Sequence, residues 1–153
     1  MSPQQLSVLI VDDSAAVRAA LSAIVKSDPG LTLFGSAGDP FQAVDLMRTS
    51  LPDVVLLDLE LPKMDGLTFL KRIMTQHPLP VVVCSSHTDS GSKSAMKALD
   101  LGAAEVLSKP RLDTPVARSE ASVRIGDALR AAVSSQPLLR KRIASAPSIR
   151  RWS

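Results

Sequence analysis

The sequence has few of the residues that build disulfides, membrane spans or secretory signals. Cys84 is the one cysteine among 153 residues, which excludes an internal disulfide and any multi-cysteine metal site. No apolar run approaches the ~20 residues of a membrane-spanning helix. The amino terminus also lacks the basic and apolar regions of a signal peptide. We therefore expect a cytoplasmic protein without membrane contact.

Acidic residues are scarce in the last part of the chain. Residues 1–110 carry nine Lys and Arg against twelve Asp and Glu, whereas residues 111–153 carry nine against three. From residue 136 onward the composition shifts to Pro, Ser and Arg without periodicity. We expect residues 5–135 to form one domain and residues 136–153 to be a basic tail or interdomain linker, disordered or partly helical. About 18 irregular residues cannot build a helix-turn-helix, so no specific nucleic-acid binding is expected.

Short apolar runs alternate with amphipathic segments along residues 5–135. The apolar runs predict five strands, over residues 6–11, 31–36, 54–57, 80–85 and 105–108. Helical periodicity follows each of the first four, and residues 119–134 suit a fifth helix. Units of about 20 to 25 residues that alternate strand and helix predict an α/β fold, a doubly wound parallel sheet with helices on both faces.

Capping residues predict where helices begin and end, and the spacing of apolar residues predicts which side chains face the core. Ser14 and Asp39 are predicted to cap the first two helices. Gly102 is predicted to end the fourth helix in a left-handed conformation. The side chains expected to point inward are Phe41, Val44 and Met47 in the second helix, and Val123, Leu129, Ala132 and Val133 in the fifth.

Polar groups stand at the carboxyl ends of four predicted strands. They are Asp12 and Asp13 after the first strand, Asp58 after the third, Ser85 and Ser86 at the fourth, and Lys109 after the fifth. Taken singly, these residues suit helix caps, turns or a solvated cation. Because the carboxyl ends of parallel strands share one edge of the sheet, we expect the groups to lie together in a common site.

The residue types at this edge suit phosphoryl transfer. Neighbouring carboxylates repel one another, and a hard divalent cation such as Mg²⁺ (or Mn²⁺) removes that repulsion. Lysine supplies a compact positive charge for phosphoryl oxygens, and serine adds a hydroxyl donor. Covalent capture of a phosphoryl group by the Asp58 carboxylate is the reaction that this combination favours.

The joint positions of these residues resemble the receiver domains of bacterial two-component response regulators. The resemblance covers about residues 5–135 and implies a flavodoxin-like (CheY-like) fold with five strands in the order 2-1-3-4-5. Residues 58–70 and 85–88 are most similar to the amino-terminal receivers of chemotaxis protein-glutamate methylesterases. The implied function is a phosphorylation-dependent switch in chemotaxis, with a sensor histidine kinase of the CheA type as phosphodonor.

The same resemblance implies a role for each residue of the site. Asp58 is the implied phosphoacceptor, and Lys109 and Ser85 are implied to contact the phosphoryl oxygens. The implied metal ligands are Asp12, Asp13, Asp58 and the backbone carbonyl of Glu60. The Lys109–Pro110 peptide is expected to be cis. The switch and tuning positions are Ser86, His87, Val106 and Pro110, with Val106 in place of an aromatic switch residue.

A methylesterase catalytic domain is absent from the sequence. No Gly-x-Ser-x-Gly-like elbow is present, and both histidines, His77 and His87, fall inside the receiver region. The alternatives left open are a regulatory part of a longer gene product with a methylesterase effector domain, or a stand-alone response regulator. A small phosphatase with Asp58 as nucleophile is a further alternative. It needs a general acid two residues on, where Glu60 is expected to point outward.

Overall fold

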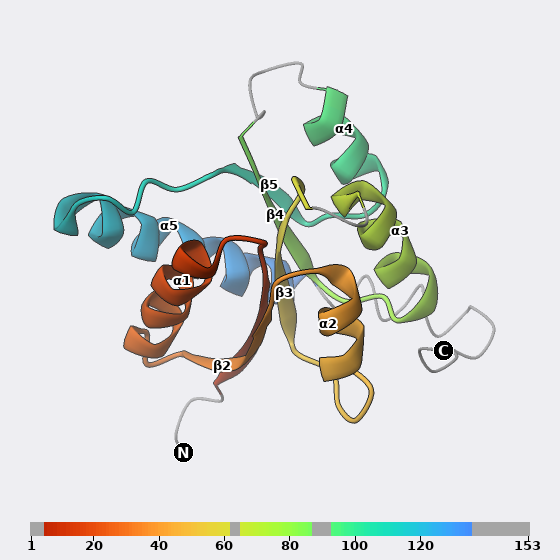
Figure 1. Ribbon diagram of the computed structural model, residues 1–153, viewed down its shortest axis with the longest axis horizontal. Helices are drawn as coiled ribbons and strands as arrows, with labels where there is room; N and C mark the ends of the chain where they lie inside the picture. The colour runs from red at the N-terminus through yellow and green to blue at the C-terminus, as the bar shows by residue number, and fades with distance from the viewer. Residues whose placement is uncertain (1–4, 62–64, 87–92, 136–153) are drawn as a thin grey trace.

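The computed structural model describes residues 5–61, 65–86 and 93–135, which form a parallel sheet between two layers of helices (Figure 1). The five strands lie in the order β2-β1-β3-β4-β5, and every pair is parallel. The predicted fold and strand order are therefore confirmed. The elements are β1 (Leu6–Val11), α1 (Ala15–Ser27), β2 (Leu31–Ala37), α2 (Pro40–Leu46), β3 (Val54–Asp58), α3 (Gly66–Gln76), β4 (Val81–Ser85), α4 (Lys93–Asp100), β5 (Glu105–Ser108) and α5 (Pro115–Ser134).

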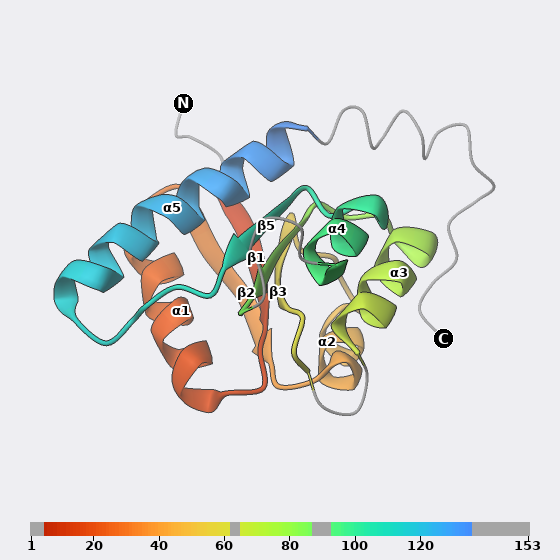
Figure 2. The ribbon, with the colours of Figure 1, turned by 90° about the horizontal axis from the view of Figure 1, so that it is seen from above.

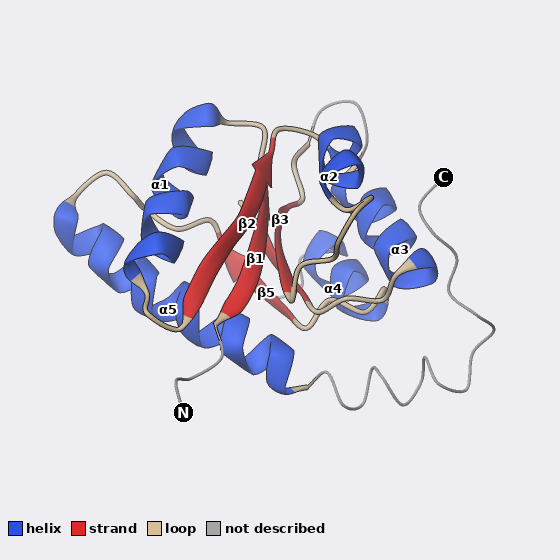
Figure 3. Cartoon of the chain, turned by 90° about the horizontal axis from the view of Figure 1, so that it is seen from below, coloured by secondary structure: helices blue, strands red, loops and turns tan. Residues whose placement is uncertain are grey.

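The two helical layers cover opposite faces of the sheet. Helices α1 and α5 pack on one face, and α2, α3 and α4 pack on the other (Figures 2 and 3). Alternate strand residues divide between the two cores, so that Ile10 faces α1 and α5 while Leu9 and Val11 face the other layer. Strands β3 and β4 are buried at every position, as expected for central strands of a parallel sheet.

The helix boundaries follow local capping chemistry. Ser14 accepts a hydrogen bond from the backbone N–H of Val17 at 3.2 Å and Asp39 caps α2 in the same way, which confirms both predicted caps. Gly102 has φ of 113°, the left-handed conformation predicted for it. Helix α5 begins at Pro115 rather than at residue 119. The reason is that Thr114 caps it and proline suits the first helical position.

Two residues predicted to point inward are exposed. Phe41 in α2 has 53% of its surface accessible, and Val123 in α5 has 62%. Val123 precedes Leu129 by six residues, a spacing that places the two on different faces of a helix. The buried positions of α5 include Ala121, Ile125, Ala128, Leu129 and Ala132, which keep the spacings of three and four.

A close backbone contact fixes the connection between β3 and α3. The N–H of Gly66 donates to the carbonyl of Leu59 at 3.2 Å, and the N–H of Leu59 donates to the carbonyl of Cys84 at 3.0 Å. A Cβ atom on residue 66 would lie 2.6 Å from the Cα and the carbonyl oxygen of Leu59. Only glycine permits this approach, which anchors the chain directly after Asp58.

Some predictions fall on residues that the structure does not describe. The tail assigned to residues 136–153 and the tuning position His87 lie outside the described residues. Within the described part of the chain, no helix combines the length and the apolar content that crossing a bilayer requires.

Candidate functional site

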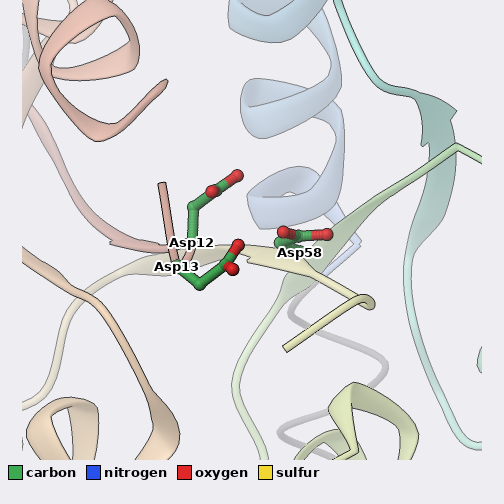
Figure 4. Close-up of side chains that lie close together, drawn as sticks. All are labelled: Asp12, Asp13 and Asp58. Carbon is green, nitrogen blue, oxygen red and sulfur yellow. The ribbon is translucent and has the colours of Figure 1, made fainter. Parts of the chain in front are cut away.

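Three carboxylates meet where β1 and β3 end. Asp12 and Asp13 follow β1 directly and Asp58 is the last residue of β3, and these strands are neighbours in the sheet. One carboxylate oxygen of each residue lies within 4.8 Å of the others (Figure 4). Asp12 and Asp58 are buried, whereas Asp13 is exposed. The expected convergence of these three residues at one edge of the sheet is confirmed.

Asp58 is the most deeply buried of the three and is incompletely partnered. Only 2% of its surface is accessible. Its Oδ1 atom accepts a hydrogen bond from the N–H of Glu60 at 3.0 Å and lies 3.3 Å from Nζ of Lys109. Its Oδ2 atom is buried without a hydrogen-bond partner among the described residues. A buried carboxylate oxygen in this state is available to bind a cation or to react.

Burial sets the acid–base properties of the cluster. It raises the pKa of Asp58 to about 7, with a further rise from the neighbouring Glu60 carboxylate and opposing effects of the Glu60 N–H and of Lys109. Burial also raises the pKa of Asp12. For Lys109, burial alone would lower the pKa, but the Asp58 carboxylate outweighs it and the pKa is raised. Burial thus disfavours the charged form of the two carboxylates at this edge, which a nearby cation would favour.

Asp12 is held in place by the start of α1. One of its carboxylate oxygens accepts a hydrogen bond from the N–H of Ser14 at 2.9 Å. Its backbone carbonyl accepts a hydrogen bond from the guanidinium of Arg18 at 2.7 Å. These contacts fix the chain that carries Asp12 and Asp13. Arg18 was not predicted from the sequence, although its position one helical turn after the capping Ser14 is a signal that points to it.

The side chain of Glu60 lies over the site, contrary to the prediction that it points outward. Its Oε1 atom accepts hydrogen bonds from the N–H of Ser86 at 3.0 Å and from the Ser86 hydroxyl. The Ser85 hydroxyl makes a longer contact with the same atom, at 3.5 Å. The other oxygen, Oε2, lies 3.6 Å from Nζ of Lys109. The donors at the end of β4 and the charge of Lys109 draw this carboxylate inward.

Lys109 directly follows β5, the outermost strand beside β4, and its side chain reaches Asp58 at the end of β3. Its N–H donates to the carbonyl of Ser85 at 3.1 Å, which brings the end of β5 beside the end of β4. The predicted cis Lys109–Pro110 bond is wrong, because there is no cis peptide among the described residues. Trans is the more stable isomer even before proline, by ~0.5–1 kcal/mol. Val106 and Pro110 are both half-buried.

Arg124 of α5 was also missed by the sequence interpretation. One of its terminal nitrogens donates to the carbonyl of Ser108 at 2.7 Å and contacts the Ser108 hydroxyl at 3.1 Å. Through Ser108 it fixes the residue that directly precedes Lys109. No local sequence signal indicates this contact, because 16 residues separate the two partners.

A 2-1-3-4-5 parallel sheet with three carboxylates and a lysine at its carboxyl edge has the architecture of a signalling receiver domain. The family model of the response regulator receiver domain matches residues 8–117, and the chain belongs to this family. This confirms the resemblance seen in the sequence.

Curated relatives and solved structures give a narrower assignment. The chain is 59% identical over 128 residues to the protein-glutamate methylesterase/protein-glutamine glutaminase of group 3 operon from Cereibacter sphaeroides; the match covers 84% of this chain and 35% of the relative. It is 52% identical to protein-glutamate methylesterase/protein-glutamine glutaminase 5 from Anaeromyxobacter dehalogenans, with 89% and 38% covered. The chain thus spans little more than a third of the length of these relatives.

Among solved structures, the response regulator domain of Thermotoga maritima CheB has a TM-score of 0.77 and 32% identity, with 86% of this chain and 98% of that chain covered. A chain in the complex of the P1 domain of CheA3 with CheY6 from R. sphaeroides has a TM-score of 0.66 and 31% identity, with 84% and 98% covered. The receiver of a CheB-type protein is therefore what this chain resembles in both sequence and fold.

Proposed function

We propose that this receiver takes a phosphoryl group onto Asp58 and thereby regulates a methylesterase in chemotaxis. The observation that carries the proposal is the position of Asp58, buried at the edge of the sheet with one oxygen 3.3 Å from Lys109 and the other without a hydrogen bond in the described part of the chain. Two more carboxylates stand within 4.8 Å. This is a nucleophile with a charge-stabilising environment.

The proposed reaction is an in-line displacement at phosphorus. A carboxylate oxygen of Asp58 forms a bond to the phosphorus of a phosphohistidine while the bond from phosphorus to the histidine nitrogen breaks. The imidazole leaves with the electron pair. Hydrolysis ends the signal. Water attacks the phosphorus of the acyl phosphate, the Asp58 carboxylate is restored as the leaving group, and inorganic phosphate is released. Lys109 and Ser85 offer positive charge and a hydroxyl donor for the phosphoryl oxygens.

The carboxylate cluster fits a divalent cation. The unpartnered Oδ2 of Asp58 and the raised pKa values of Asp12 and Asp58 support this fit, because the contacts within the chain do not fully offset the cost of burying these carboxylates in their charged form. Mg²⁺ prefers oxygen ligands and commonly uses one or two carboxylates together with phosphate oxygens. Asp12, Asp13, Asp58 and the carbonyl of Glu60 would hold it. When bound, the ion would neutralise charge on the phosphoryl group.

The partners follow from the relatives. The solved complex of CheA3 P1 with CheY6 contains a receiver of the same fold, which supports a histidine kinase of the CheA type as phosphodonor. The curated relatives are methylesterases about three times the length of the matched region, which supports an effector domain beyond residues 5–135 in a longer gene product. Residues 136–153 would then lead toward that domain.

Intact mass after incubation with Mg²⁺ and acetyl phosphate tests the proposal. A hydroxylamine-labile adduct of one phosphoryl group should appear on the parent chain and be absent from Asp58→Asn. Asp53→Asn is the matched control, because Asp53 precedes the same strand at its other end, and it should label like the parent. Equal labelling of Asp58→Asn and the parent would place the reaction elsewhere.

The phosphatase alternative receives less support from the site. It requires a protonated general acid two residues after the nucleophile, at Glu60. Burial alone would raise the pKa of Glu60, but the hydrogen bonds from Ser86 together with Asp58 and Lys109 lower it to about 2. A carboxylate with this pKa is ionised at neutral pH and cannot donate a proton to a leaving group.

A further inference from the structure

The peptide group between Ser108 and Lys109 is held from two sides. Its N–H, which belongs to Lys109, donates to the carbonyl of Ser85 at the end of β4, at 3.1 Å. In a trans peptide the carbonyl points the opposite way. This carbonyl, of Ser108, accepts a hydrogen bond from the Arg124 guanidinium of α5 at 2.7 Å, and the Ser108 hydroxyl lies 3.1 Å from the same nitrogen. Strand β4 and helix α5 therefore fix this peptide group between them.

The outer side of this peptide group has little other support. Strand β5 ends the sheet, so in the described part of the chain no strand pairs with its outer edge. A cavity of about 340 Å³ is lined by residues 108–111 and by four residues of α5, which are Ala117, Glu120, Ala121 and Arg124. Packing between the β5–α5 connection and the helix is therefore incomplete, and Arg124 provides hydrogen bonds where van der Waals contacts are missing.

The same peptide group determines where Lys109 enters the site. Nζ of Lys109 lies 3.3 Å from Oδ1 of Asp58, and the lysine side chain is 39% exposed. Few neighbours therefore restrict the side chain, so the position of its ammonium group depends on where the backbone is fixed. A displacement of about 1 Å at a reacting group can cost on the order of 100-fold in rate.

We propose that Arg124 is a positioning residue for phosphorylation. By holding the Ser108 carbonyl, it keeps Lys109 within contact distance of the Asp58 carboxylate and of the incoming phosphoryl group. This inference rests on the proposed function, since the phosphoryl group is the anion that Lys109 stabilises in that reaction. Arg124 acts only through Ser108 and Lys109 in this scheme, and helix α5 thereby takes part in the chemistry at the edge of the sheet.

Substitution of Arg124 should slow phosphorylation without preventing it. Arg124→Ala leaves the peptide group held by Ser85 alone, so labelling by acetyl phosphate with Mg²⁺, followed by intact mass over time, should slow about tenfold. Arg124→Lys keeps the charge and one donor but loses the planar guanidinium, and should recover part of the loss. Arg118→Ala is the matched control and should label at the parent rate. Arg118 is also a cation of α5, and it donates to another carbonyl of the same connection, that of Leu112, at 2.7 Å.

A double-mutant cycle shows whether Arg124 acts through Lys109. If it does, adding Arg124→Ala to Lys109→Ala should slow the reaction no further. A tenfold loss in both backgrounds would overturn the inference, since Arg124 would then act by its own charge or on the fold as a whole. A parent-like rate for Arg124→Ala alone would also overturn it.

The amide of Lys109 gives a readout that does not depend on the reaction. Its N–H belongs to the same peptide group as the Ser108 carbonyl. In ¹H–¹⁵N spectra, the Lys109 signal should therefore shift in Arg124→Ala and keep its place in Arg118→Ala. An unshifted Lys109 signal in Arg124→Ala would refute the inference even where the parent chain forms the phosphoryl adduct. A parent chain that forms no adduct with acetyl phosphate would refute the proposed function, and the inference with it.

Discussion

The two ends of the sheet treat their acidic residues differently. At the amino end, Asp53 is exposed and its carboxylate accepts both the N–H and the hydroxyl of Ser7, at 2.8 and 3.2 Å. The Ser7 hydroxyl in turn accepts from the Asp53 N–H at 2.9 Å. At the carboxyl end, Asp58 is buried and one of its oxygens has no hydrogen bond within the described chain. The two carboxylates are only five residues apart.

The contrast separates a structural acid from a reactive one. Asp53 joins the start of β1 to the start of β3. Because its carboxylate already accepts hydrogen bonds from Ser7 and is exposed to water, binding a ligand there would stabilise the protein little. Asp58 carries a desolvation cost that its neighbours offset only partly, which is the condition in which a bound cation or a covalent modification stabilises a site. Four predictions test this comparison.

Lys109→Ala should have the largest effect. Lys109 is the only described cation within 4.0 Å of the Asp58 carboxylate, and removing such a donor of charge should slow phosphorylation by acetyl phosphate on the order of 100-fold. The rate is measured by intact mass over time. Lys26→Ala, near the amino end of the sheet in the last turn of α1, is the control and should keep the parent rate. A Lys109→Ala rate close to that of the parent would remove Lys109 from the site.

The second prediction concerns pH in the presence of a chelator. The folded pKa of Asp58, about 7, lies above its ordinary value of 3.8, so between these two pH values the folded state keeps a proton that the unfolded state has released. The free energy of unfolding should therefore fall as pH rises from 5 to 8, by about 1 to 3 kcal/mol.

Urea unfolding with EDTA at several pH values measures this slope, and Asp58→Asn should flatten it. Adding Mg²⁺ at pH 8 should raise the stability of the parent more than that of Asp58→Asn, because the ion binds the folded carboxylates. A parent and variant with the same pH slope would contradict the assigned charge burial.

The third prediction tests the structural role of the acid at the amino end. Asp53→Ala should lower the free energy of unfolding by about 1 kcal/mol, since Ser7 loses its hydrogen-bond partner. Phosphorylation by acetyl phosphate should be unchanged. A double-mutant cycle with Ser7→Ala measures the coupling between the two residues. A strong loss of phosphorylation in Asp53→Ala would remove the distinction between the two ends.

The smallest effect is expected for Gly126→Ala. Glycine in a helix costs about 1 kcal/mol relative to alanine, which would favour the substitution. A Cβ atom at residue 126, however, would lie 2.8 Å from the Arg130 guanidinium and 3.0 Å from the Asp28 carboxylate. These groups form an ion pair at 3.1 Å, and a partly exposed pair is easily displaced.

The two effects should nearly cancel, leaving a change within about 0.5 kcal/mol in urea unfolding. Arg130→Ala with Gly126→Ala separates them, because without Arg130 the alanine should gain its full helix preference. A double variant with no such gain would show that the ion pair is not what opposes alanine.

The sequence predicts the strand ends well because the apolar runs are short and end in polar residues. Each of these runs is long enough for a single strand, so the polar residue at its end marks the end of the strand. These residues are Asp12, Asp58 and Ser85. The side chain of Glu60 was mispredicted for a different reason. Its direction depends on donors 26 residues away at Ser86 and on the charge of Lys109, and no local pattern contains that information.

The helix faces show the same limit. Helical spacing predicts the buried face of a helix only if one buried residue is known as a starting point. In α5 the buried face includes Ile125 and not Val123, which had been predicted to point inward. The start of α5 was predicted late although the Thr114-Pro115 pair is a standard capping signal. The residues that start α5 therefore carry the signal for its first turn in the sequence itself.

The contact between Gly66 and Leu59 has a consequence for how the chain can vary. Backbone atoms tie residue 59 both to Cys84 and to residue 66, so the base of this connection is closed on two sides. A residue inserted at the base would pull the nucleophile out of register with its neighbours. We therefore expect insertions and deletions to be tolerated only between Glu60 and Gly66. Changes in length there leave the Asp58 carboxylate in the position that β3 gives it.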